Sequence, residues 1–284
     1  MARRFNSPYQ TEPVSALATW ARYLALFALV AAAVSIIIIR FGFLELKPAL
    51  ATFFGALGCA ALSVLVAFAG FAAIWQNGSR GMLRILFALV LDILILAYPG
   101  YLAWQWRRLP AIHDITTDPI DPPRYEALAR LRATDGANPA AYAGLYSAEQ
   151  QQLAYPDIEP VTLDVTVQQA FDATLKLVNR RKWLIIDERP PQPPRMIGKI
   201  EAVARTPIMG FREDVVIRVA PDGAGSRVDI RSSSRYFEHD LGTNAARVAK
   251  LIDDLNEVAE PSTAPVKKPV APAAAVQAKE RGKR

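Results

Sequence analysis

Three long apolar stretches dominate the first hundred residues of this 284-residue chain. They run from Ala18 to Ile39, from Ala49 to Trp75 and from Met82 to Trp104. A helix rises about 1.5 Å per residue, so about 20 apolar residues cross the ~30 Å hydrocarbon core of a bilayer. We therefore predict an α-helical membrane anchor of three transmembrane helices over residues 18–106, after a short N-terminal segment, residues 1–17.

The next segment, residues 107–152, has no regular apolar period and is rich in proline and aspartate. Proline pushes the residue before it out of the helical region, and prolines recur along this segment, at Pro119, Pro122, Pro123 and Pro139. We predict an extended linker with one short helix around residues 123–133. The last stretch, residues 261–284, is mostly Pro, Ala, Val and Lys. Such a composition cannot build a core, so we predict a disordered basic tail.

A compact soluble domain is predicted between the linker and the tail, over residues 153–260. Apolar residues follow a helical period over Thr166–Val178, and Thr166 with Gln169 matches a capping box. Four runs have the alternation of strands: Trp183–Asp187, Arg195–Ala204, Asp214–Ala220 and Ser226–Ser234. A second helical stripe covers Leu241–Ala259. The order α-β-β-β-β-α predicts an α+β domain, an antiparallel four-stranded meander with two helices on one face.

Charge is distributed unevenly along the chain, although its net charge is only +6. Residues 1–110 carry a net charge of +6 and residues 261–284 one of +5, whereas residues 111–260 carry 18 basic and 23 acidic residues. The central domain is therefore mildly acidic, which argues against nucleic-acid binding. One cysteine and two histidines argue against a disulfide framework and a metal centre. We expect no metal and no cofactor.

Two features of the apolar stretches are unusual. Asp92 lies inside the third stretch, where a carboxyl group is costly and normally finds a partner. We interpret it as a lock between helices, with a proton or ion relay as the alternative. Small residues recur every four positions along the second stretch, at Ala51, Gly55, Cys59, Ser63 and Ala67. Such a stripe allows close helix packing, either within the chain or in a homo-oligomer through Gly55, Cys59 and Ser63.

A cluster of arginines and polar side chains surrounds the predicted start of the last helix. Its members are Arg231, Ser232, Ser234, Arg235, Asn244 and Arg247. A helix N-terminus offers free N–H groups, and nearby arginines and hydroxyls complete a site for an anion. In the structural alternative, Asp240 is the N-cap of the helix and the arginines pair with carboxylates. Strand alternation places the two serines on the helix-covered face, and Arg231 and Arg235 on the other.

No constellation for catalysis stands out, and we assign no catalytic residue. Ser234, His239 and Asp240 lie close in sequence, but no nucleophile elbow accompanies them. The open face of the predicted sheet carries both signs of charge, in Lys199, Glu201, Asp214, Arg218, Arg227, Asp229 and Arg231. We expect cross-strand ion pairs on a solvated surface there, with a docking surface for another protein as the alternative.

Several of these residues lie in a series of short motifs. The motifs are Ile112–Asp118, Ala154–Pro156, Gly198–Ala202, Gly210–Val219, Arg231–Arg235 and Asp240–Asn244. Over residues 112–256 the chain resembles an uncharacterised domain-of-unknown-function family of bacterial envelope and plastid proteins. The resemblance implies an envelope location and no known activity.

The orientation of the three helices follows from the positive-inside rule. Five arginines flank the side that holds the N-terminus, and four basic residues flank the other side. This count favours a cytoplasmic N-terminus and a domain on the opposite side of the membrane. With the resemblance, it predicts a multi-pass protein of the bacterial inner (cytoplasmic) membrane with a periplasmic domain.

These observations lead to one main hypothesis and two alternatives. The main hypothesis is a membrane-anchored envelope protein, a non-enzymatic module that binds a partner protein or an anionic amphiphile such as an anionic lipid. The first alternative is a membrane-proximal enzyme that uses Glu201, Asp214 or Asp240 as acid or base. The second alternative is an assembly or scaffold subunit of a membrane complex.

Overall fold

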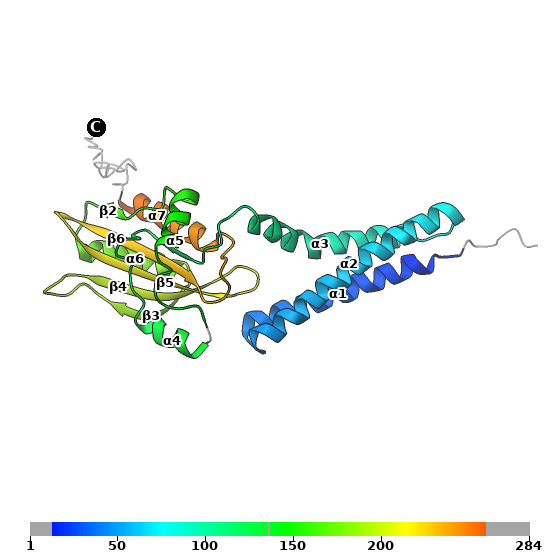
Figure 1. Cartoon of the computed structure of the whole chain (residues 1–284), viewed down its shortest axis with the longest axis horizontal. Helices are drawn as coiled ribbons and strands as arrows, with labels where there is room; N and C mark the ends of the chain where they lie inside the picture. The colour runs from blue at the N-terminus through cyan, green and yellow to red at the C-terminus, as the bar shows by residue number, and fades with distance from the viewer. Residues whose placement is uncertain (1–12, 136, 260–284) are drawn as a thin grey trace, which may run out of the picture.

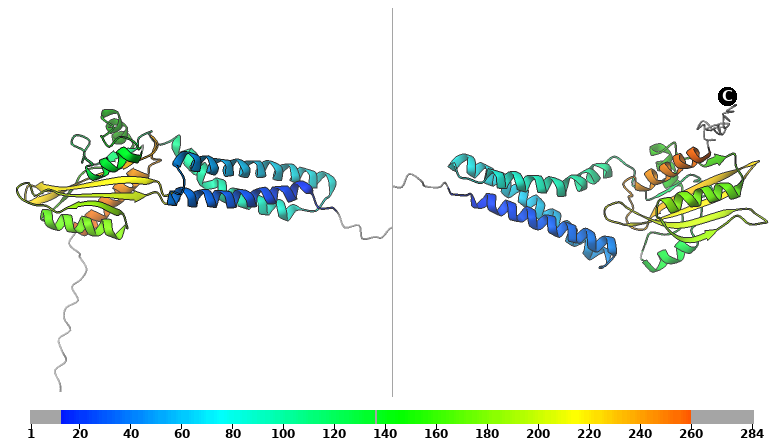
Figure 2. Two further views of the ribbon diagram at one scale, coloured as in Figure 1. Left: turned by 90° about the horizontal axis from the view of Figure 1, so that it is seen from below. Right: turned by 180° about the vertical axis from the view of Figure 1, so that it is seen from behind.

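The computed structural model describes residues 13–135 and 137–259. A bundle of three long helices lies at one end of the molecule, and a domain of sheet and helices lies at the other (Figure 1; Figure 2). The predicted tail, residues 261–284, lies outside the described residues, as does most of the predicted N-terminal segment, residues 1–17.

The bundle consists of α1 (Ala16–Phe41), α2 (Leu46–Asn77) and α3 (Met82–Trp106). All three helices are long and apolar enough to cross a membrane, as predicted. Their contact faces are rich in small side chains, including Ala18, Ala21, Ala25, Ala60, Ala67 and Ala88. Large apolar side chains such as Phe27, Leu65 and Leu83 are exposed on the outside of the bundle. Small residues inside and large apolar residues outside are the arrangement expected of helices surrounded by lipid.

The sheet of the domain contains the predicted meander and two further strands. The meander consists of β3 (Leu184–Arg189), β4 (Gly198–Arg205), β5 (Arg212–Asp222) and β6 (Gly225–Ser234). Two short strands, β1 (Asp114–Thr116) and β2 (Val161–Leu163), pair with opposite ends of β6 along its outer edge. The prediction of four strands is therefore corrected to six. Three-residue strands are too short to show an alternating pattern.

The apolar face of the sheet is covered by α6 (Val167–Arg180) and α7 (Thr243–Ala259), as predicted. Thr166 and Gln169 form the expected capping box at the start of α6. The core between the layers includes Phe171, Ile217 and Leu251, all fully buried. The alternation of β5 and β6 therefore predicts correctly which side chains face the helices.

The opposite face of the sheet is covered as well, contrary to the expectation of a solvated surface. Tyr125 and Leu128 pack against Val203 of β4 and Val216 of β5. Most of the charged side chains of this face are buried beneath them: Glu201, Asp214, Asp229 and Arg231. Glu201 accepts hydrogen bonds from backbone N–H groups at the start of α4 (Ala127–Asp135), both at 2.8 Å. The predicted open face is thus an inner layer held by ion pairs and by a helix N-terminus.

The segment predicted as an extended linker, residues 107–152, is instead part of the folded domain. It contributes β1, α4 and most of α5 (Leu145–Ala154). Gln151 on α5 bonds to both backbone groups of Thr116, with N···O distances of 3.0 and 2.7 Å. The glutamine amide therefore replaces a further strand and closes the edge of β1. Prolines do interrupt regular structure in this segment, but contacts with the distant sheet hold it in place.

Candidate functional site

The residues of the predicted anion site lie on two faces of the sheet. Strand alternation in β6 separates the serines from Arg231 and Arg235, as expected. Ser232, Ser234, Asn244 and Arg247 do come together, under the start of α7. The six residues therefore do not form a single site.

An internal carboxylate occupies the centre of the first group. Glu213 of β5 accepts hydrogen bonds from Ser234 Oγ at 3.0 Å and from Thr243 Oγ1 at 2.6 Å, and it forms an ion pair with Arg247. Arg247 also donates to Ser232 Oγ and to Asn244 Oδ1, at 3.0 and 2.9 Å. We call these six residues the Glu213 cluster. The side chain of Glu213 thus takes the place that sequence reasoning assigned to an external anion.

Sequence reasoning missed Glu213, although a signal for it exists. Val215 faces the helices, so the residue two positions earlier in β5 shares that face. Glu213 also pairs with Ser234 in the β5–β6 register. Extending the alternation of β5 back by two residues would have placed a carboxylate beside the serines.

The second group consists of buried ion pairs. Arg231 binds Asp114 through two hydrogen bonds, at 2.9 and 2.6 Å. Asp214 lies between Arg132 and Arg235, with N···O distances of 2.7 and 2.9 Å. Each of these side chains is at most 3 % exposed. Arg231 and Arg235 therefore belong to the interior of the domain, and the structural alternative describes them correctly.

Asp240 binds the backbone in front of α7. Its carboxylate accepts N–H groups of Gly242 at 2.9 Å and Asn244 at 2.8 Å. The helix begins at Thr243, after a left-handed turn at Leu241 and Gly242, so Asp240 stabilises the helix start from three residues before it. Burial raises the pKa of Asp240, while the two N–H groups act in the opposite direction.

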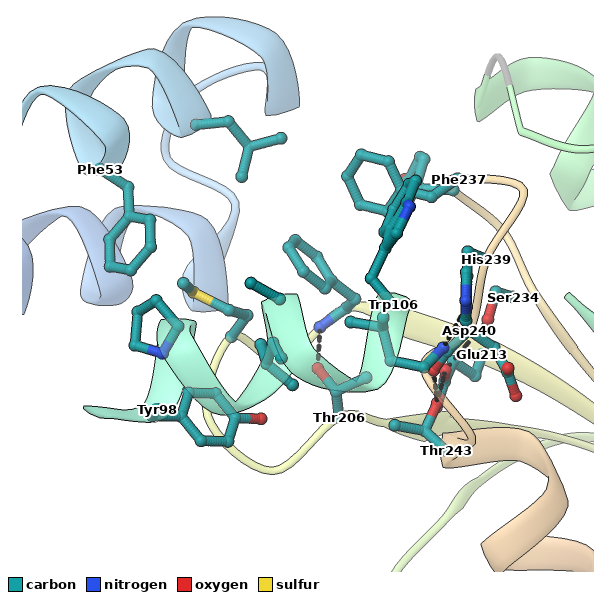
Figure 3. Close-up of a pocket in the computed structure, with 18 of the residues that line it drawn as sticks. Phe53, Tyr98, Trp106, Thr206, Glu213, Ser234, Phe237, His239, Asp240 and Thr243 are labelled. Atoms are coloured by element: carbon teal, nitrogen blue, oxygen red, sulfur yellow. Dashed lines mark hydrogen bonds between the residues drawn. The ribbon is translucent and has the colours of Figure 1, made fainter. Parts of the chain in front are cut away.

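A cavity of about 530 Å³ lies between α2, α3 and the domain. Its wall on one side is apolar and includes Phe53, Phe54 and Leu57 of α2 and Tyr98 and Leu102 of α3. Its other end is polar and includes Glu213, Ser234, His239, Asp240 and Thr243 (Figure 3). We call it the junction cavity. Its volume lies within the ~300–1,000 Å³ range of small-molecule sites.

One aromatic contact joins α3 to the domain beside the junction cavity. Trp106 stacks on His239, with 5.0 Å between ring centroids. Within the domain, Phe211 meets Phe237 edge to face at 5.5 Å, and both line the cavity. His239 accepts a hydrogen bond from Leu241 N–H at 3.0 Å, while its Nε2 lies 3.2 Å from the Leu109 carbonyl oxygen. These bonds fit a neutral imidazole that donates from Nε2.

Comparison with protein families matches residues 114–255 to the family described as protein of unknown function, DUF1499. The chain belongs to the DUF1499 family. The polar end of the junction cavity lies within this family domain, whereas α2 and α3 lie before it. The complete cavity therefore depends on the apolar helices α2 and α3 as well as on the family domain.

No curated protein matches the chain. Among solved structures, the chain has a likeness to the crystal structure of CalU16 from Micromonospora echinospora. The two are 16 % identical, and the match covers 36 % of this chain and 74 % of CalU16 with a TM-score of 0.25. A likeness this low carries no argument about fold or function.

The carboxylates considered for catalysis in the DUF1499 domain do not meet in one place. Glu201 and Asp214 are fully buried on the face away from α7, and only Asp240 lines the junction cavity. The Ser234 hydroxyl donates a hydrogen bond to Glu213, and the His239 ring binds backbone groups of Leu109 and Leu241. The Ser234, His239 and Asp240 side chains therefore do not form the hydrogen-bonded series of a catalytic triad.

The unusual residues of the apolar stretches lie within the bundle and on its surface. Asp92 of α3 is fully buried beside Ser63 of α2. Ser63 donates to the carbonyl oxygen of Ala21 at 3.0 Å, so it serves packing within the chain and does not reach the outside. Gly55 is exposed and Cys59 is half-buried. The locking role of Asp92 and an oligomer through α2 remain predictions.

Proposed function

We propose that the protein is a membrane-anchored, non-enzymatic binding module that holds a lipid-like amphiphile in the junction cavity. The observation that carries this proposal is the composition of the cavity wall. Membrane helices supply its apolar side, and the family domain supplies its polar end. An amphiphile also has an apolar part and a polar part, so its apolar chain fits the wall from the helices and its head group fits the polar end.

The depth of the apolar wall supports a ligand from one leaflet. The wall reaches Leu57 on α2, and the apolar stretch of this helix begins at Ala49 on the side of the domain. At 1.5 Å per residue this distance is about 12 Å, less than half of the ~30 Å hydrocarbon core. A lipid chain lying along this wall would therefore stay within the domain-side half of the bilayer.

The cavity favours an amphiphile over a partner protein or a catalytic role. A partner protein needs an accessible patch, whereas the apolar side chains here line a concavity between the helices and the domain. An enzyme with Glu201, Asp214 and Asp240 needs carboxylates that converge on a substrate. Of these three, only Asp240 lines the cavity, and its oxygens bind the backbone.

The location is part of the proposal. We propose that the helices lie in the bacterial inner membrane and that the domain faces the periplasm, on the support of the arginine count and the family resemblance. Alkaline phosphatase fused after Glu260 should be active in intact cells. An inactive fusion, together with an active cytoplasmic reporter at the same site, would reverse the orientation.

The test of binding is to fill the cavity. Ala103 of α3 lines the junction cavity, whereas Ala97, on the same helix, is exposed and lies outside the cavity lining. We expect native mass spectrometry and lipid analysis of the purified chain to find a bound amphiphile in the wild type and in Ala97→Trp. Ala103→Trp should lose the bound amphiphile, because the tryptophan side chain occupies the space of its acyl chain. Equal ligand content in all three proteins would exclude the cavity as the binding site.

A further inference from the structure

Three arginines lie at the junction of the membrane helices and the domain. Arg40, at the end of α1, donates to the carbonyl oxygens of Pro207 at 2.9 Å and Ile208 at 3.2 Å. Arg205 donates to the carbonyl oxygen of Arg40 at 2.8 Å. Arg107 follows α3, is exposed and lines the junction cavity. We call Arg40, Arg107 and Arg205 the arginine rim.

The charge of the arginine rim is not neutralised by the described part of the chain. Two of its members bind backbone carbonyls, which carry no net charge, and no salt bridge to any described carboxylate includes Arg40, Arg107 or Arg205. The loop that Arg40 binds approaches it closely, since a Cβ at Gly210 would lie 2.9 Å from Arg40 Cγ. Arg40 and Arg205 are therefore fixed at the junction, and the positive charge of all three arginines is available to an anion.

The carboxylates that line the junction cavity do not balance this charge. Glu213 forms an ion pair with Arg247 and accepts two hydroxyl groups. Asp240 is buried and binds two backbone N–H groups, and its burial favours the neutral form. Arg107 is thus a cation of the lining that has no carboxylate partner among residues 13–135 and 137–259.

The arginine rim lies at the level where lipid head groups are expected. Aromatic residues mark the domain-side end of α3, at Tyr98, Tyr101, Trp104 and Trp106. Tyrosine and tryptophan gather where the hydrocarbon core meets the head groups, and Arg107 is the next residue after Trp106. The apolar wall extends from this level towards the midplane. A lipid of the same leaflet would place its phosphate beside the rim and one chain along the wall.

We infer that the junction cavity selects a phospholipid of net negative charge from the domain-side leaflet, with Arg107 as the residue that binds the phosphate. This inference rests on the proposed function, because it assigns a head group to the same cavity. Arginine donates charge-assisted hydrogen bonds to phosphate oxygens. Arg40 and Arg205 add positive potential at the same end of the helix bundle. A zwitterionic head group neutralises its own phosphate and gains less from the rim.

The test compares two lipids with identical chains on the full-length protein in detergent. Phosphatidylglycerol and phosphatidylcholine are added in turn, and native mass spectrometry measures the bound fraction. We expect the wild type to prefer phosphatidylglycerol by about tenfold, the effect of one charge-assisted hydrogen bond. Arg107→Gln should remove most of this preference, because it weakens binding of phosphatidylglycerol more than binding of phosphatidylcholine. Arg107→Lys should restore part of it, since the charge returns without the fork of donors.

Arg108 provides the matched control. It is the neighbouring residue, but its guanidinium group lies 4.2 Å over the Trp104 ring and it is not part of the cavity lining. Arg108→Gln should keep the full preference for phosphatidylglycerol. An equal loss in both variants would show a general effect of surface charge and would overturn the role of Arg107.

The remaining outcomes separate the two proposals. If the wild type binds both lipids equally and Ala103→Trp binds neither, the head-group inference is wrong and the proposed function stands. If the wild type binds neither lipid, the head-group inference is wrong, and the co-purified amphiphile of the wild type and of Ala103→Trp decides the proposed function by itself. Inorganic phosphate serves as the third arm. If it displaces phosphatidylglycerol completely and Ala103→Trp has no effect, the arginines bind free phosphate and the lipid inference is overturned.

Discussion

Glu213 and Asp214 are neighbours in β5 and carry the same charge, yet they lie on opposite faces of the sheet. Asp214 is enclosed between Arg132 and Arg235 and has no exposed surface. Glu213 binds Arg247, Ser234 and Thr243, and it lines the junction cavity. One carboxylate is sealed inside the domain, whereas the other lies next to a space that a ligand or water can enter.

The difference between the two carboxylates shows why a charged cluster in the sequence is an ambiguous signal. A buried charge must be paired, so arginines gather around Asp214 to maintain the fold. The Glu213 cluster has the same kinds of residue, but three of its members, Glu213, Ser234 and Thr243, also line the polar end of the junction cavity. Of the two groups, only the Glu213 cluster lies next to α3, where a ligand in the junction cavity can reach it. Three substitutions test this contrast.

The largest effect is expected on the sealed side. Asp214→Asn leaves Arg132 and Arg235 buried without a counter-charge, and we expect a loss of about 3–5 kcal/mol in the free energy of unfolding. Chemical denaturation of the full chain in mild detergent measures it. Asp222→Asn is the control, because Asp222 ends the same strand and is exposed. Similar stability of the two variants would contradict the view of Asp214 as an essential partner of the arginines.

A smaller effect is expected on the cavity side. Glu213→Gln keeps acceptors for Ser234 and Thr243 but removes the charge that pairs with Arg247. We expect a loss of about 1.5–3 kcal/mol, the range for hydrogen bonds to charged groups, because the Arg247 side chain is 11 % exposed and water partly solvates it. The same denaturation experiment measures it. A loss as large as that of Asp214→Asn would mean that Glu213 is sealed too, and the contrast between the two carboxylates would disappear.

The smallest effect is expected at Asp240 and depends on pH. Burial raises its pKa in the folded chain above the ordinary value of 3.8. The folded chain therefore holds this proton more tightly than the unfolded chain does. The stability that comes from protonated Asp240 is fully present below pH 3.8, and it is lost as pH rises through the raised pKa of the folded chain.

Asp240→Asn removes this titration. Because a helix-terminal acceptor is weakened, we expect a loss of about 0.5–2 kcal/mol at low pH. The loss should shrink as pH rises from about 4 to 7, because the wild type then has a buried charge and the variant does not. Melting temperatures of both proteins across this range provide the measurement. Parallel curves would show that Asp240 is ionised throughout and that burial does not control it.

Local periodicity in the sequence determined much of the architecture. Long apolar runs over α1, α2 and α3 predict helices that can cross a membrane, because a bilayer requires length and apolarity alone. The period of two in β5 and β6 and the period of 3.6 in α6 and α7 identify the apolar face of each element. The capping box at Thr166 places the start of α6, since its hydrogen bonds join residues three apart.

Only the tertiary structure decided what covers the polar face of the sheet and where a site lies. Arg231 and Asp114 are 117 residues apart, and Arg132 and Asp214 are 82 residues apart. Periodicity within one element cannot report such a contact, and in the sequence a buried ion pair resembles two solvated charges. The junction cavity likewise exists only where α2 and α3 meet the loops that precede β5 and α7. Local patterns encode which side of an element is apolar, whereas long-range packing determines which distant segment meets its polar side.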